Sequence, residues 1–185
     1  MHCYGGLAKY KTNLLTVGCS GQMKNKWSNG KQATEIMQRN NDTFIWSVVD
    51  SNLFADVQEH SLVTVPPSEI TEEYVLLIGG YVEFQAFSNF NGWSDAVFKF
   101  NGKWSFFGKL KRPRRWHNSI YWNGAVYVIG GGVEVNRSVE PESKMEIWTI
   151  ADSPNEFKTT ENWPELLAWD EPHLFIVPDS LFPDY

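Results

Sequence analysis

The chain contains 185 residues, of which 42% are hydrophobic and 15% are aromatic. This composition excludes a disordered polar chain and provides enough apolar surface for the core of one ordinary domain. The formal net charge of −6 argues against a general nucleic-acid binder, and the lack of an apolar stretch of roughly 18 residues argues against membrane insertion.

A short apolar run that ends at a glycine is the first recurring feature along the chain. The run closes at Gly18 in "NLLTVGCSG", at Gly79 in "EYVLLIGG" and at Gly130 in "AVYVIGGG". A fourth run, "HLFIVPD", has Pro178 at the matching position. Successive positions lie 61, 51 and 48 residues apart, and a period near 50 residues is typical of an array of similar units.

Each unit predicts four strands in chain order. The first strand begins at a histidine, and the second is the apolar run itself, whose continuous hydrophobicity is typical of a strand buried on both faces. The histidines are His2, His60 and His117. The third strands begin near Ala33, Asp95 and Lys144, and the fourth begin near Phe44, Lys103 and Glu156.

Two Asn-Gly pairs predict how these strands are connected. Asn101–Gly102 joins the third and fourth strands of the second unit, and Asn123–Gly124 joins the first two strands of the third unit. Asn-Gly is the preferred two-residue hairpin turn, because both of its positions take positive φ. The turns therefore predict an up-and-down antiparallel meander, and no segment keeps a helical apolar period over three turns.

The recurring glycines and histidines have a structural interpretation. We expect glycine where neighbouring backbones approach too closely for a side chain. A histidine at one repeated position argues against catalysis, because an active site needs different groups at one place. We therefore interpret His2, His60 and His117 as structural residues that donate or accept a hydrogen bond.

The runs "VLLIGG" and "VYVIGG", the "NG" turns, the approach "RPRRWHNSIYWNG" and a last strand led by Trp104 resemble the kelch-repeat family of β-propellers. The resemblance is strongest between Glu73 and Trp148. It implies an all-β fold, a kelch-type β-propeller of four-stranded antiparallel blades. The chain would form a single domain over residues 1–185, with units at about 1–52, 53–108 and 109–162 and a partial fourth unit at 163–185.

About three and a half such units make an incomplete ring, because closed propellers have typically 4 to 8 blades. An open ring leaves two apolar faces in water, which is rare on a stable monomer. We therefore expect additional blades or self-association to close the ring.

The resemblance implies a non-catalytic protein-interaction scaffold or adaptor, with no cofactor and no bound metal. Its partner would be another protein, bound through the long connections between second and third strands and between successive units, where function usually resides on a rigid scaffold. The alternative is a carbohydrate-binding protein or a truncated secreted propeller enzyme of the galactose-oxidase-like type. Such an enzyme uses a tyrosine–cysteine cofactor, and Cys3 and Cys19 belong to no ligand-like cluster.

Two segments in these connections supply the candidate contact residues. A basic run at residues 109–115 could bind an acidic partner segment, or it could be a solvated loop whose arginines bond to neighbouring backbone. An aromatic loop at residues 81–93 could be a binding hot spot, or a small core of its own. The predicted partner-binding residues are Arg112, Arg114, Arg115, Trp116, Phe87, Phe90 and Trp93.

The two cysteines leave the compartment open. As buried thiols they favour the cytoplasm, and as one disulfide they would favour secretion. The N-terminal residues lack the basic and apolar segments of a signal peptide, which also favours the cytoplasm.

Overall fold

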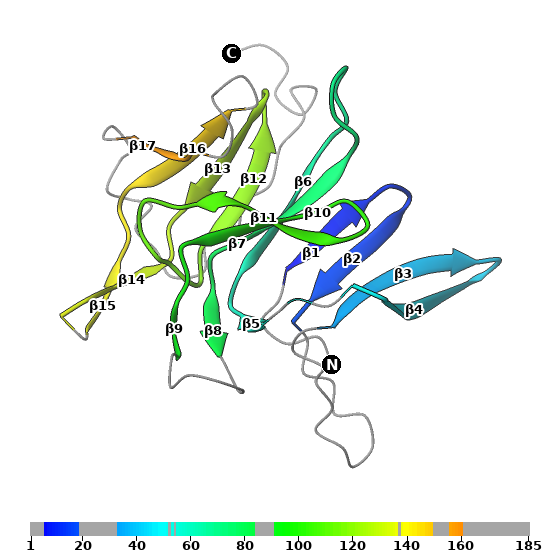
Figure 1. Cartoon of the computed structure of the whole chain (residues 1–185), viewed down its shortest axis with the longest axis horizontal. Helices are drawn as coiled ribbons and strands as arrows, with labels where there is room; N and C mark the ends of the chain where they lie inside the picture. Colours follow the sequence, from blue (N-terminus) through cyan, green and yellow to red (C-terminus); the bar gives the residue numbers. More distant parts are fainter. Residues whose placement is uncertain are drawn as a thin grey trace, which may run out of the picture.

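The computed structural model describes residues 6–18, 33–51, 53, 55–83, 91–136, 138–149 and 156–160. Every regular element in these ranges is a β-strand, and three antiparallel sheets of four strands form the body of the molecule (Figure 1). This part of the chain contains no helix long and apolar enough to cross a membrane. The partial fourth unit predicted at 163–185 lies outside the described residues.

Each sheet consists of four strands in the predicted sequence order. The first sheet holds β1 (Leu7–Tyr10), β2 (Asn13–Val17), β3 (Thr34–Asn40) and β4 (Thr43–Val49). The second holds β6 (Ser61–Val65), β7 (Tyr74–Ile78), β10 (Ala96–Phe100) and β11 (Trp104–Lys109). The third holds β12 (Asn118–Trp122), β13 (Ala125–Ile129), β16 (Met145–Thr149) and β17 (Lys158–Thr160).

The all-β class and the four antiparallel strands of each unit are therefore confirmed. The first strand of the first unit is described over Leu7–Tyr10, and the predicted start at His2 lies outside the described residues. His60 and His117 stand one residue before β6 and β12, and each follows a residue with positive φ.

Two smaller sheets occupy stretches that the sequence predicted as loops. One is formed by β5 (Asp56–Gln58), β8 (Tyr81–Glu83) and β9 (Asn91–Trp93), and the other is the hairpin of β14 (Gly132–Val135) and β15 (Ser138–Pro141). These strands have only three or four residues, which is too short for an alternating apolar pattern to identify a strand. Strand β8 begins directly after Gly80, and β14 begins directly after Gly131.

The second sheet packs between the other two, and its strand β7 shows how. Successive side chains of a strand point to opposite faces. Val75 and Leu77 therefore belong to a core shared with the first sheet, whereas Leu76 and Ile78 belong to a core shared with the third. All five residues of β7 are buried, as its continuous apolar run predicts.

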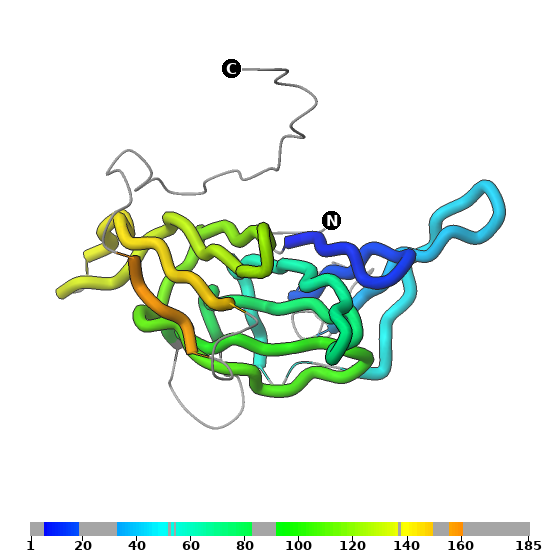
Figure 2. Tube along the Cα trace, turned by 90° about the horizontal axis from the view of Figure 1, so that it is seen from above, coloured from blue at the N-terminus to red at the C-terminus, as the bar shows by residue number. Residues whose placement is uncertain are grey.

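The sheets fan out from their first strands. Strand β1 lies beside β6, and β6 lies beside β12. The fourth strands β4 and β17 lie at opposite ends of the molecule (Figure 1). The hairpin of β3 and β4 extends beyond the other sheets, as the cyan segment in Figure 2 shows.

A histidine fills the space between the glycines of neighbouring units. A Cβ atom added to Gly79 would lie 2.9 Å from Cε1 of His117, and one added to Gly131 would lie 2.8 Å from Cβ of His117. His117 thus contacts the first glycine of the preceding unit and the second glycine of its own. The same arrangement unites His60, Gly18 and Gly80. The close approach expected at the recurring glycines is therefore confirmed.

The role of the histidines differs in one respect from the prediction. Both ring nitrogens of His60 are buried, and they have no hydrogen-bond partner within the ranges that the structure describes. The His60 ring therefore acts by packing against glycine, which corrects for His60 the hydrogen bond expected from the sequence. Burial lowers the pKa of His60 to about 4, and burial, with the nearby Arg114 charge as a smaller cause, lowers the pKa of His117 to about 3.

These lowered pKa values predict acid sensitivity between pH 6.5 and about 4. The unfolded chain binds protons at histidine below pH 6.5, whereas the folded chain keeps both rings neutral, so acidification favours unfolding. We expect the free energy of unfolding to fall by up to about 1.4 kcal/mol per pH unit for each histidine. Denaturant titrations between pH 7 and 5 measure this slope, and His117→Asn should reduce it. An unchanged slope in that variant would contradict the prediction.

Candidate functional site

The candidate site is built where the link between the second and third units passes β9 and β14. Backbone hydrogen bonds fix this link: the Arg115 nitrogen donates to the Gly132 carbonyl at 3.3 Å, and the Gly132 nitrogen donates to the Arg115 carbonyl at 2.9 Å. The Trp116 nitrogen donates to the Glu59 carbonyl at 3.2 Å. Trp116 also has a φ of 57°, which turns the chain sharply before His117. The link is therefore held in one conformation by its backbone.

The guanidinium of Arg115 lies among three aromatic rings. Its central carbon is 3.7 Å from the ring centre of Trp116, 4.3 Å from that of Trp93 and 5.7 Å from that of Tyr81. The two indole rings meet edge to face, with their centres 6.0 Å apart. An arginine over indole faces gains cation–π attraction on top of its ion pairs. We call Tyr81, Trp93, Arg115 and Trp116 the Arg115 cluster.

Glu59 completes the electrostatics of the Arg115 cluster. Its Oε2 accepts a hydrogen bond from Nη1 of Arg115 at 3.1 Å, and the two side chains are 16% and 20% exposed. Glu59 and Trp116 occupy the same position in successive units, one residue before the histidine, and both have positive φ. The charge of Arg115 is therefore held in place and partly balanced, while the cluster keeps contact with solvent.

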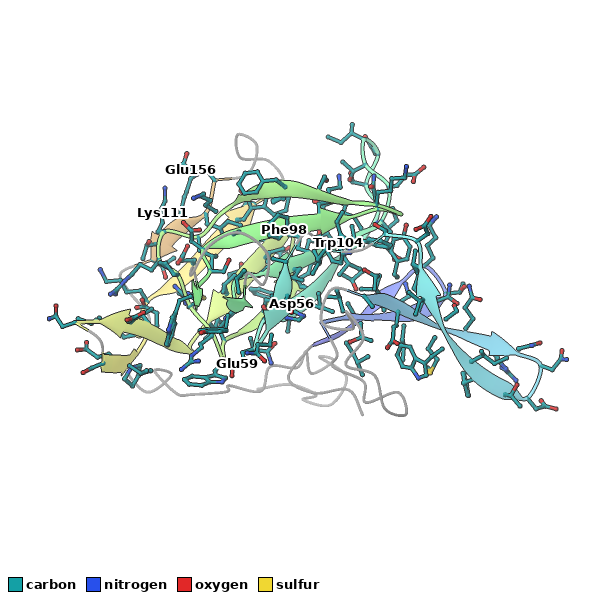
Figure 3. The ribbon with its side chains drawn as sticks, turned by 60° about the horizontal axis from the view of Figure 1, so that its bottom comes forward. Asp56, Glu59, Phe98, Trp104, Lys111 and Glu156 are labelled. Atoms are coloured by element: carbon teal, nitrogen blue, oxygen red, sulfur yellow. The ribbon has the colours of Figure 1, made fainter. Side chains whose placement is uncertain are left out.

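The basic run that contains Arg115 is not a free positive patch. Each of its five cations lies within 4 Å of a carboxylate. The pairs are Lys109–Asp95, Lys111–Glu156, Arg112–Glu142, Arg114–Glu146 and Arg115–Glu59. In Figure 3 Lys111 and Glu156 lie together, well separated from Glu59 at the lower edge of the molecule. The run is thus spread over more than one side, which weakens the predicted capture of an acidic segment.

Arg114 is a structural residue. Its side chain is completely buried, its Nη2 donates to Oε1 of Glu146 at 2.7 Å, and its Nη1 donates to the carbonyls of Lys144 at 3.1 Å and Gly130 at 3.4 Å. A partner cannot reach a side chain without exposed surface, so the prediction of Arg114 as a contact residue is wrong. The alternative that an arginine of the run bonds to neighbouring backbone holds for Arg114.

The other predicted contact residues fall into three groups. Arg115, Trp116 and Trp93 come together in the Arg115 cluster, although they belong to separate segments of the sequence. Arg112 is about half exposed and pairs with the buried Glu142, outside the cluster. Phe87 and Phe90 lie outside the described residues.

Sequence reasoning missed Tyr81, Glu59 and Glu146. Tyr81 follows the glycine pair directly, and Glu59 shares its repeat position with Trp116, so the alignment of the units contained a signal for both. Glu146 interrupts the apolar strand "KMEIWTI", and a charge inside a buried strand indicates a partner. The partner itself could be named only from the structure.

An apolar cavity of ≈ 140 Å³ lies beside the cluster. Trp93 forms one wall, and Leu77, Val82 and Phe98 contribute further apolar surface, with Asp95 as the charged group. Its volume is below that of ordinary ligand pockets, which measure about 300–1,000 Å³. Among the residues that the structure describes, no three His, Cys, Asp or Glu side chains gather as a metal-binding group. Cys3 and Cys19 lie outside those residues.

Comparison with known proteins supports the fold at a distance. No family model matches the sequence, and no curated protein matches it. Among solved structures, that of YjhT is similar to this chain, with a TM-score of 0.58 and 13% sequence identity. The similarity covers 85% of this chain and 45% of YjhT, so the chain spans less than half the length of that protein.

Proposed function

We propose that the chain is part of a kelch-type β-propeller that acts as a non-catalytic protein-interaction module. Three features support the ring arrangement. Four-stranded sheets pack face to face in succession, their first strands lie side by side, and each junction repeats one histidine between glycines. The glycine runs and Asn-Gly turns of the sequence agree with this arrangement, which places the connections between sheets on two opposite rims.

The Arg115 cluster is the surface that we propose for partner binding, and the observation that supports it is the guanidinium held at 3.7 Å and 4.3 Å from two indole rings. Trp, Tyr and Arg are the residues most enriched at binding hot spots. Side chains already held in place lose less entropy on binding than free ones do. Because Glu59 balances Arg115, the surface suits a partner of mixed polar and aromatic character better than a strongly acidic one.

The test compares two arginines of the same run. A partner captured with the whole chain is purified, and its affinity is measured by calorimetry with Arg115→Ala and with Arg112→Ala. We expect Arg115→Ala to weaken binding at least tenfold, because truncating a hot-spot residue costs about 2 kcal/mol or more. Arg112→Ala should change the affinity less than threefold, because Arg112 lies outside the cluster and pairs with Glu142.

Two results would contradict the proposal. Equal affinity for wild type and Arg115→Ala would show that the cluster is not the contact surface. Binding to a glycan array that is lost in Trp93→Ala would instead support the carbohydrate-binding alternative, because indole faces also stack on sugar rings.

A further inference from the structure

The outer face of the first sheet carries a group of exposed apolar side chains. By strand register, Leu14 lies opposite Met37, and Met37 lies opposite Trp46, so these side chains share one face with Phe44 and Val48. Phe44 is 64% exposed and Val48 is 61% exposed. The opposite face of the same sheet packs in the core shared with the second sheet. No sheet among the residues that the structure describes covers the outer face.

The third sheet has a second face of this kind. Ile120 lies opposite Tyr127, and Tyr127 lies opposite Ile147, on the side away from the second sheet. Trp122 is 56% exposed, and its ring centre lies 6.0 Å from that of Tyr127. Apolar side chains of this size are rarely gathered on a free surface without a partner.

The two faces correspond to the two halves of an interface that the molecule already forms twice. The second sheet meets the first through Val75 and Leu77, four and two residues before its first glycine. Leu14 and Thr16 hold those positions before Gly18 on the outer face of the first sheet, where Leu14 is 36% exposed and Thr16 is buried.

The receiving half of the interface follows the same rule. The first sheet receives the second through Leu15 and Val17, three and one residues before Gly18. In the third sheet these positions are Tyr127, which is partly exposed, and Ile129, which is buried, and both point away from the second sheet. By position in the repeat, the outer face of the third sheet is therefore equivalent to a face that accepts another sheet. The outer face of the first sheet is equivalent to a face that docks on one.

We propose that a second copy of this chain covers both faces, with the third sheet of each copy packed on the first sheet of the other. One copy presents both halves of the interface, so two copies related by a twofold axis satisfy both and close a ring of six sheets. The proposal rests on the ring arrangement proposed above but not on the Arg115 cluster.

Light scattering coupled to size-exclusion chromatography tests the proposal on the full chain. We expect a wild-type mass of about twice 21.3 kDa. Phe44→Glu and Trp122→Glu each place a charge in one half of the interface, and each should halve the mass while the far-ultraviolet circular dichroism stays that of wild type. Ile70→Glu, which changes an 84% exposed side chain between β6 and β7, should leave the mass at that of the pair.

An experiment that mixes the two interface variants tests directly whether the first sheet of one copy binds the third sheet of another. Phe44→Glu retains an intact third sheet and Trp122→Glu an intact first sheet, so an equimolar mixture should recover a pair through one intact interface. If Phe44→Glu fails to fold, Val48→Glu replaces it on the same face.

Three results would overturn the proposal. A wild-type mass of 21.3 kDa would show that the faces stay free or are covered by another molecule. Masses beyond the pair would show an open chain of copies. Retention of the pair in Trp122→Glu with its loss in Phe44→Glu would show that two first sheets contact each other. Arg115→Ala should leave the mass unchanged, so failure here is distinct from failure of the proposed binding function.

Discussion

Replacing Glu146 by alanine is expected to lower the free energy of unfolding by about 3–5 kcal/mol, the cost of breaking a buried ion pair on one side. Glu146 is fully buried, and its carboxylate accepts hydrogen bonds from Arg114 Nη2 at 2.7 Å and from the Lys111 nitrogen at 2.6 Å. Alanine leaves the guanidinium buried without its counter-charge, and it leaves two backbone donors, the nitrogens of Lys111 and Arg112, unpaired. Since whole domains are stable by about 5–15 kcal/mol, urea denaturation should show a large shift of the midpoint.

Two further variants distinguish the buried pair from charge effects in general. Glu156→Gln removes the carboxylate that pairs with Lys111 at the surface, and exposed pairs contribute about 0–1 kcal/mol, so the midpoint should barely move. The double variant Glu146→Leu with Arg114→Met removes both charges, and it should lose less stability than Glu146→Ala alone. A double variant as unstable as the sum of two single variants would contradict the assignment of a coupled pair.

Gly131→Ala is expected to lower the free energy of unfolding by about 2–5 kcal/mol. Gly131 has a φ of 83°, a conformation that costs an ordinary residue about 1–2 kcal/mol. A Cβ atom there would also lie 2.7 Å from the backbone nitrogen of His117 and would collide with the Arg115 carbonyl oxygen. Such overpacking costs about 1–3 kcal/mol more, because neither backbone atom can move aside.

Gly124→Ala is the matched control for this collision. Gly124 has a similar φ of 79°, but nothing lies within 4 Å of the added Cβ atom. We expect a loss of about 1 kcal/mol, since the backbone penalty is partly offset by the lower entropy of the unfolded chain. Equal losses in the two variants, measured by thermal unfolding, would show that crowding at Gly131 adds nothing to the backbone conformation.

The repeated pattern of the sequence was enough to predict the strands of all three sheets, because its signals are local. A continuous apolar run such as Tyr74–Ile78 and a turn such as Asn123–Gly124 encode their geometry within a few residues. The smaller sheet of β5, β8 and β9 was missed for the converse reason. Its strands have three residues each, and β5 pairs with β8 across the intervening residues 59–80, so no local pattern indicates the pairing.

The candidate site was predicted only in part. The sequence suggested a basic run and an aromatic loop as two separate features, and the structure joins Arg115 of the first to Trp93 of the second. The sequence could not show which of Arg114 and Arg115 is buried, because two adjacent arginines differ in burial only through the direction in which the backbone turns. The φ of 57° at Trp116 and the acceptors around Arg114 make that difference.

The junction of histidine and glycines described above makes the units interchangeable blocks. The histidine side chain of each unit packs against a glycine of the preceding unit, and the glycines of each unit receive the histidine of the following one. The two ends of a unit are therefore complementary to those of its neighbours. A gene segment of one period can therefore be duplicated or deleted, because the units that become neighbours contact each other through the same histidine and glycines. The length of a protein with this architecture can change by whole units without a new interface between them.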